Sequence, residues 1–221
     1  MSKYIKPIKT GIAGLDEFLL GGLTPGVYIL MGPLESGKEV FAQQIAYTRA
    51  RQYKITYFTI SRTPESIKDD MATYGWDVSK YEKEDTLRLK QYFTQFDSYL
   101  DTVIKEIEQQ RGVIIDSLSE LLITGKTEEA ILLLNTISKY NKEQQELHLV
   151  LLTTEMQDQK TETTIQHFAD GVIEFSTRWD TENLVRTMVI KKMKGTIIPT
   201  RRLPYSLARN GFTIETATRI T

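Results

Sequence analysis

The stretch that most constrains the fold reads GVYILMGPLESGKEVFAQQIAYTRAR and spans residues 26–51. Its first part, Gly26–Gly32, is a short apolar run ending in glycine, which predicts a buried strand. Its last part, from Lys38 onward, has the apolar spacing of a helix. The sequence Gly-x-x-x-x-Gly-Lys joins the two. Glycines let backbone N–H groups turn inward, the helix N-terminus adds partial positive charge, and Lys38 can reach outer phosphates, so this stretch predicts a phosphate cradle.

Strand-like and helix-like patterns alternate through the first 155 residues. Thr63 followed by Pro64 predicts a capped helix start. The alternation predicts an α/β protein with a mostly parallel sheet and helices on both faces. The further expected strands lie at 55–60, 86–92, 113–117 and 147–155, and the further expected helices at 63–75, 98–112 and 127–141.

The pattern changes after Glu155. The polar segment 156–164 predicts a loop, and strand-like runs follow at 171–177, 184–193 and 211–214 without a long helix between them. We expect these to extend the sheet as antiparallel C-terminal strands. With no repeat or linker in the chain, we predict a single domain over 1–221.

The composition is that of a soluble globular protein. Hydrophobic residues make up 40% and charged residues 26%, with a net charge of −1 and no cysteine. We therefore expect a cytoplasmic location, no membrane partner, no thiolate metal site and no Cys nucleophile. His148 and His167 are isolated, and His148, at a strand start, is expected to be solvated.

Asp116 ends another apolar strand, in GVIIDSLSEL. Phosphate-loop proteins carry an Asp at this place, where it holds the Mg²⁺ shell. Taken alone, Asp116 could equally do no more than end a strand.

Six segments in order resemble the KaiC-like ATPases of the RecA superfamily: TGIAGLDEFLLGGLTPGVYILMG, ESIKDDMATYGWDVSKY, VIIDSLSEL, LLTTE, VIKKMKGTIIP and NGFTI. The resemblance covers nearly the whole chain. It implies a RecA-like P-loop core, ATP with Mg²⁺ as ligand, and a homo-oligomer such as a hexameric ring with ATP between subunits, or a hetero-partner protein.

The resemblance also implies roles for particular residues. The nucleotide would be held by Gly32, Ser36, Gly37, Lys38, Glu39 and Asp116. Lys192 and Lys194 match a basic pair that reaches the phosphates of a neighbouring subunit in the family. A solvated edge strand explains these two lysines equally well.

Two departures from the family fall on its catalytic positions. Glu39 replaces the Ser or Thr that ligates Mg²⁺; a carboxylate about 4 Å from a phosphate charge costs on the order of 4 kcal/mol at an effective dielectric constant of 20. Ser61 and Arg62 replace a pair of glutamates, one of which activates water, and losing such a group slows reaction by about 10²–10⁴-fold.

Local patterns suggest what Glu39 does instead. Ser36 and Glu39 fit the Ser-x-x-Glu capping box, so each is expected to bond the other's amide. We also expect an ion pair between Glu39 and Arg62 at the metal or γ-phosphate position, with Lys38 turned toward Asp116. Should Mg²⁺ bind, Glu39 and Asp116 would be its ligands.

Three functions compete at this point. The first is a hydrolysis-defective KaiC-like protein acting as a regulatory or scaffold subunit, with weak or lost ATP binding. The second is a working ATPase that uses Glu39 at the metal site. The third, a RadA-paralogue-like DNA-binding protein, is disfavoured because the segment 156–164 is not cationic.

Overall fold

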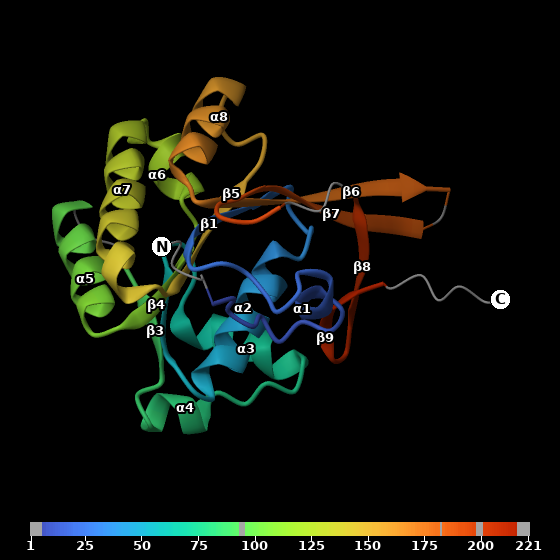
Figure 1. The fold of residues 1–221 in the computed structure, drawn as a ribbon, viewed down its shortest axis with the longest axis horizontal. Coiled ribbons are helices and arrows are strands. Elements are labelled where there is room, and N and C mark those ends of the chain that lie inside the picture. The colour runs from blue at the N-terminus through green and yellow to red at the C-terminus, as the bar shows by residue number, and fades with distance from the viewer. Residues whose placement is uncertain (1–5, 93–95, 182, 198–200, 216–221) are drawn as a thin grey trace.

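The computed structural model describes residues 6–92, 96–181, 183–197 and 201–215. Its strands in this part of the chain are β1 (Gly26–Gly32), β2 (Lys54–Thr59), β3 (Leu87–Gln91), β4 (Arg111–Asp116), β5 (Leu147–Thr153), β6 (Gly171–Asp180), β7 (Asn183–Met193), β8 (Leu203–Ala208) and β9 (Gly211–Ile214). They form one sheet in the order β3-β2-β4-β5-β1-β6-β7-β8-β9 (Figure 1). The pairs from β3 to β6 are parallel and those from β6 to β9 antiparallel, which confirms the predicted sheet.

Helices cover both faces of the sheet, as predicted. One face carries α1 (Leu15–Phe18), α2 (Lys38–Ala50), α3 (Pro64–Thr73) and α4 (Ser79–Lys83). The other carries α5 (Phe96–Glu108), α6 (Ser119–Ile123), α7 (Thr127–Gln144) and α8 (Gln159–Phe168). Figure 1 shows α5 and α7 on the side of the sheet opposite to α2 and α3. No helix in the described ranges is both long and apolar enough to cross a membrane.

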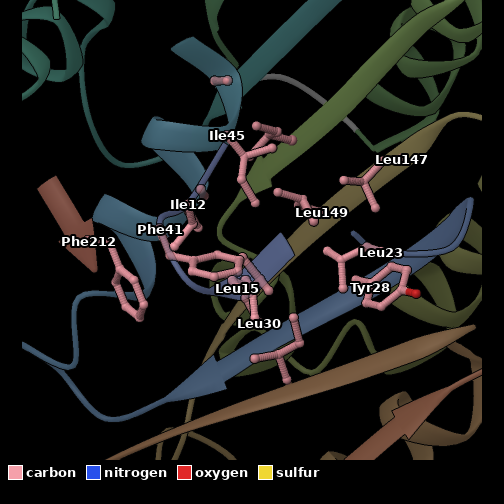
Figure 2. Close-up of a cluster of buried hydrophobic side chains, with 14 of the residues drawn as sticks. Ile12, Leu15, Leu23, Tyr28, Leu30, Phe41, Ile45, Leu147, Leu149 and Phe212 are labelled. Carbon is pink, nitrogen blue, oxygen red and sulfur yellow. The ribbon is translucent and has the colours of Figure 1, made fainter. Parts of the chain in front are cut away.

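The central strand β1 is apolar throughout because both of its faces are buried. Tyr28 and Leu30 belong to the hydrophobic cluster under α2, whereas Val27, Ile29 and Met31 belong to the cluster on the other face. Figure 2 shows the first cluster, where side chains from α2 lie over β1 and β5. This alternation places β1 between the two helix layers. The loop that follows β1 then lies at the carboxyl ends of the parallel strands.

The carboxyl ends of four strands meet at one edge of the sheet. Gly32 at the end of β1 is level with Thr153 at the end of β5, and Thr59 at the end of β2 is level with Asp116 at the end of β4. Ligand sites of open α/β sheets form outside this edge. The register therefore brings the predicted phosphate loop and Asp116 to the same side of the molecule.

The predicted loop at 156–164 is wrong, because α8 begins at Gln159. Asp158 caps this helix by accepting a hydrogen bond from the Thr161 amide at 3.0 Å. Ile165 is its one fully buried residue, so the apolar periodicity that marks a helix is nearly absent. Two further differences are that α5 ends at Glu108 rather than near Gly112, and that β8 was not predicted.

The hairpin of β6 and β7 extends past the sheet edge and projects from the body in Figure 1. Its pairing continues as far as Asp180 opposite Asn183. Trp179 near its tip is 73% exposed. The other tryptophan, Trp76, is buried and stacks on Tyr74, with ring centroids 4.9 Å apart.

Candidate functional site

The loop between β1 and α2, called the cradle below, leads into the helix without a side-chain cap. Gly37 precedes α2 with φ 82°, a left-handed conformation that glycine adopts without strain, and no side chain caps the helix. The expected capping box of Ser36 and Glu39 is therefore wrong. The Ser36 hydroxyl oxygen is buried and has no hydrogen-bond partner among the described residues.

The amides at the start of α2 likewise lack acceptors among the residues that the structure describes. In the described part of the chain no acceptor is recorded for the N–H groups of Gly37, Lys38, Glu39 and Val40. A helix start leaves such donors unpaired, and they favour anions together with the helix dipole. Donors of this kind are suited to a phosphate group.

Lys38 is fully buried and bound to its own neighbour. Its ammonium nitrogen lies 2.7 Å from Glu39 Oε1 and donates to the Pro33 carbonyl at 3.3 Å. The Glu39 side chain is 30% exposed. The expectation that Lys38 turns toward Asp116 is wrong, because Lys38 forms its ion pair with the carboxylate of Glu39, the next residue on α2.

The expected ion pair between Glu39 and Arg62 is wrong as well. Arg62 instead pairs with Asp70 at 2.6 Å and donates to the Ser66 hydroxyl at 2.7 Å, so its guanidinium is held over α3. Across the ranges that the structure describes, no salt bridge links Arg62 to Glu39. The position after β2 therefore supplies neither a carboxylate nor a partner for Glu39.

Asp116 is held at the end of β4 by a buried tyrosine. The Tyr57 hydroxyl donates to Asp116 Oδ2 at 2.7 Å. Burial, with smaller contributions from the charges of Glu39 and Glu120, raises the pKa of Asp116 to about 6, against the lowering effect of the Tyr57 hydrogen bond. Glu39 therefore shares one electrostatic environment with Asp116, although the two lie on different elements.

Two residues near Asp116 were not predicted from the sequence. They are Tyr57 and Glu120. Glu120, at the start of α6, accepts hydrogen bonds from the Ser117 hydroxyl at 2.6 Å and from the Ser117 amide at 3.3 Å. Its place four residues after Asp116 was visible in the sequence. Tyr57 lies within a strand of β-branched and aromatic residues, where nothing marks it as a hydrogen-bond donor.

His148 is buried in β5 rather than solvated, which corrects the prediction for it. Its Nδ1 accepts a hydrogen bond from the Val113 amide at 3.2 Å. Burial lowers the pKa of His148 to about 3, so the imidazole is neutral. It lies between strands as a core residue.

The family model described as "ATPase: KaiC" matches residues 8–219. The chain belongs to the KaiC-like ATPase family. Two UPF0273 proteins are similar over almost their full lengths: one from Pyrococcus furiosus is 25% identical, with 95% of this chain and 94% of that protein aligned. One from Thermotoga maritima is 26% identical, with 95% and 96% aligned.

The fold matches a solved KaiC-like protein. The crystal structure of a KaiC-like protein from Pyrococcus horikoshii OT3 superposes with a TM-score of 0.82 at 24% identity, covering 96% of this chain and all of that one. The RecA-type P-loop core expected from the sequence is thereby confirmed.

The lysines that match the KaiC basic pair lie away from the cradle. Lys192 donates to the carbonyls of Gln166 and His167 at the end of α8, at 3.3 and 2.9 Å. Lys194 pairs with Asp170 at 3.2 Å, just before β6 begins. Both thus engage groups at the amino end of β6, so within one chain they do not reach Lys38.

The residues present fit ATP better than they fit Mg²⁺. The free amides and the unpartnered Ser36 hydroxyl suit a phosphate chain, and Lys38 adds a cation. For Mg²⁺ the candidates are Asp116 and Glu39, but Glu39 is bound to Lys38. No group of three or more His, Cys, Asp or Glu able to hold a metal occurs among the described residues.

Proposed function

We propose that this KaiC-like protein binds a nucleoside triphosphate weakly, hydrolyses it poorly, and works as a regulatory or scaffold subunit. One observation carries the proposal: the 2.7 Å pair between Lys38 and Glu39 at the start of α2, where the N–H groups of residues 37–40 have no protein acceptor among the described residues. Glu39 acts as an internal substitute for phosphate on Lys38. A nucleotide has to displace it, so binding is weakened without the cradle being lost.

Poor hydrolysis is supported by the residues directly after β2. Ser61 and Arg62 stand where a water-activating carboxylate is needed, and Arg62 is committed to Asp70 and Ser66. Water attack without a general base is slower by about 10²–10⁴-fold. A protein that binds ATP without hydrolysing it is suited to signal by occupancy rather than by turnover.

Direct titration of ATP–Mg²⁺ into the full chain by calorimetry tests the proposal. The wild type should bind weakly, and Glu39→Gln should bind at least about fivefold more tightly, because it removes a charge that opposes phosphate by about 1–4 kcal/mol between the limits of water and an effective dielectric constant of 20. Glu35→Gln is the matched control. Glu35 is exposed on the same loop, so its neutralisation should change affinity by less than about threefold.

Phosphate release measured on the same samples tests the second part. An ordinary turnover of about 10 s⁻¹ by the wild type would overturn the proposal. So would ATP–Mg²⁺ binding that is absent in both the wild type and Glu39→Gln.

A second candidate is an active ATPase with Glu39 at the metal site. It is favoured by the electrostatic proximity of Glu39 to Asp116. Once released from Lys38, the Glu39 carboxylate would join Asp116 as an oxygen ligand of the kind Mg²⁺ prefers. In this case Glu39→Gln weakens ATP–Mg²⁺ binding while leaving binding of ATP without Mg²⁺ unchanged or tighter, which is opposite to the first proposal.

A further inference from the structure

The C-terminal strand β8 touches the phosphate loop at two points. The Tyr205 hydroxyl donates a hydrogen bond to the Ser36 carbonyl oxygen, and both residues are buried. Two residues further on, Leu207 packs so closely on Gly37 that a Cβ there would lie 2.7 Å from Leu207 Cδ1. The loop is therefore shaped from outside by a strand 169 residues away in sequence.

The hydrogen bond from Tyr205 fixes the direction of the next amide. The Ser36 carbonyl and the Gly37 N–H belong to one planar trans peptide unit, so they point to opposite sides. With the carbonyl held toward Tyr205, the Gly37 N–H points away from β8, where no protein acceptor is recorded within the described ranges. Rotation of this peptide would place a carbonyl oxygen where a phosphate needs a donor.

Tyr205 itself is held in place by aromatic neighbours. Its ring stacks on Phe212 of β9 with centroids 4.3 Å apart and an interplanar angle of 18°, and meets Phe175 edge-on at 5.8 Å. The Phe212 amide donates to Gln44 Oε1 of α2 at 2.7 Å. The hydroxyl thus sits on a hairpin that is anchored to the helix beginning at the loop.

We propose that Tyr205 is a positioning residue that keeps the phosphate loop in its binding-competent shape, and that the β8–β9 hairpin acts on nucleotide affinity through it. Tyr205 does not touch the nucleotide. It acts through the Ser36–Gly37 peptide. The effect on affinity rests on the proposed function, whereas the effect on the loop does not.

Tyr205→Phe isolates the hydroxyl, since the ring and its stacking on Phe212 remain. Tyr28→Phe is the matched control: Tyr28 is also buried, and its hydroxyl is hydrogen-bonded to Thr24 Oγ1 at 2.7 Å, at the opposite end of β1. Both variants should lose a similar amount of thermal stability, because each loses one buried hydrogen bond.

Hydrogen–deuterium exchange of the nucleotide-free protein and ATP titration then separate the two. We expect amide exchange across residues 34–40 to be about threefold to tenfold faster in Tyr205→Phe and unchanged in Tyr28→Phe, with ATP affinity lowered by the same factor in Tyr205→Phe alone. Equal loop exchange in the two variants would overturn the inference. If the wild type binds no nucleotide, the proposed function fails, and the exchange comparison still decides this inference.

Discussion

Two buried ionisable side chains, Asp116 and His148, lie on the neighbouring strands β4 and β5 and have pKa values shifted toward their neutral forms. Burial is the first cause in both cases, raising the pKa of Asp116 and lowering that of His148. Because a carboxyl group and an imidazole carry opposite charges when ionised, the same physical cause gives opposite dependences of stability on pH.

Asp116 makes the fold less stable as the pH rises. Its pKa is about 6 in the folded chain against 3.8 for the free group. Its contribution to the free energy of unfolding is therefore full below pH 3.8 and is lost as the pH rises above about 6. We expect Asp116→Asn to remove this loss and to gain about 2 kcal/mol over the wild type between about pH 4.5 and pH 7.5. Urea unfolding at both pH values measures it. A stability difference that does not change with pH would contradict the assignment.

His148 acts in the other direction. Its pKa is about 3 when folded against 6.5 for the free group, so its contribution is present above pH 6.5 and is lost as the pH falls. Near pH 5 the loss should be about 2 kcal/mol. His148→Gln keeps an acceptor for the Val113 amide but does not titrate, so its stability should fall less between about pH 7.5 and pH 5. An identical fall in both proteins would count against a buried neutral imidazole.

The placement of Lys38 and Asp116 directly after buried strands could be predicted because a glycine loop and a strand end are local signals. The partners of Glu39 and Arg62 could not, since they depend on tertiary distances. Arg62 pairs with Asp70, eight residues along on α3, instead of Glu39. The Ser36 capping pattern failed because Gly37, in its left-handed conformation, precedes the helix instead.

At the level of elements, the strands buried on both faces gave the clearest sequence signal, and β8 is the described strand that the sequence did not predict. β1 and β5 are covered on both faces, so every residue in them is buried, and a continuous apolar run marks them. β8 is short and contains Pro204 with only two fully buried residues, Leu203 and Tyr205, and therefore gives little signal. Its role against the phosphate loop could not be foreseen from a strand that was not itself predicted.

The helix α8 begins at a side-chain cap. Asp158 accepts from both the Thr161 amide at 3.0 Å and the Thr161 hydroxyl at 2.6 Å. Asp158→Ala should destabilise the protein by about 1 kcal/mol and lower its melting temperature by about 2–4 °C. Calorimetry measures the change. Asp101→Ala, an exposed position inside α5, is the control and should be neutral or slightly stabilising; equal losses in both would show that the cap contributes nothing.

At the level of the whole molecule, the cradle and the basic pair occupy opposite ends of the parallel strands. The single-domain organisation and the ring predicted from the family both remain predictions. The geometry does set a condition for the basic pair: a second copy has to bring Lys192 and Lys194 to the cradle, because in their own chain they bind α8 and Asp170.

A double variant, Lys192→Ala with Lys194→Ala, tests this condition. In dilute solution, where light scattering finds single chains, ATP affinity should match the wild type within about twofold; at concentrations where chains assemble, it should be weaker. Lys191→Ala is the control on the same strand, since Lys191 is exposed and pairs with Glu174 at 3.3 Å. Equal affinities at all concentrations would remove the two lysines from the nucleotide site.

The projecting β6–β7 hairpin gives the chain a built-in optical label. Of its two tryptophans, Trp76 is enclosed by aromatic rings and Trp179 faces solvent near the hairpin tip. Iodide should therefore quench the emission of Trp179 and spare that of Trp76. Any protein that covers the hairpin will shift the Trp179 emission to shorter wavelength, so that its docking can be followed in the unmodified chain.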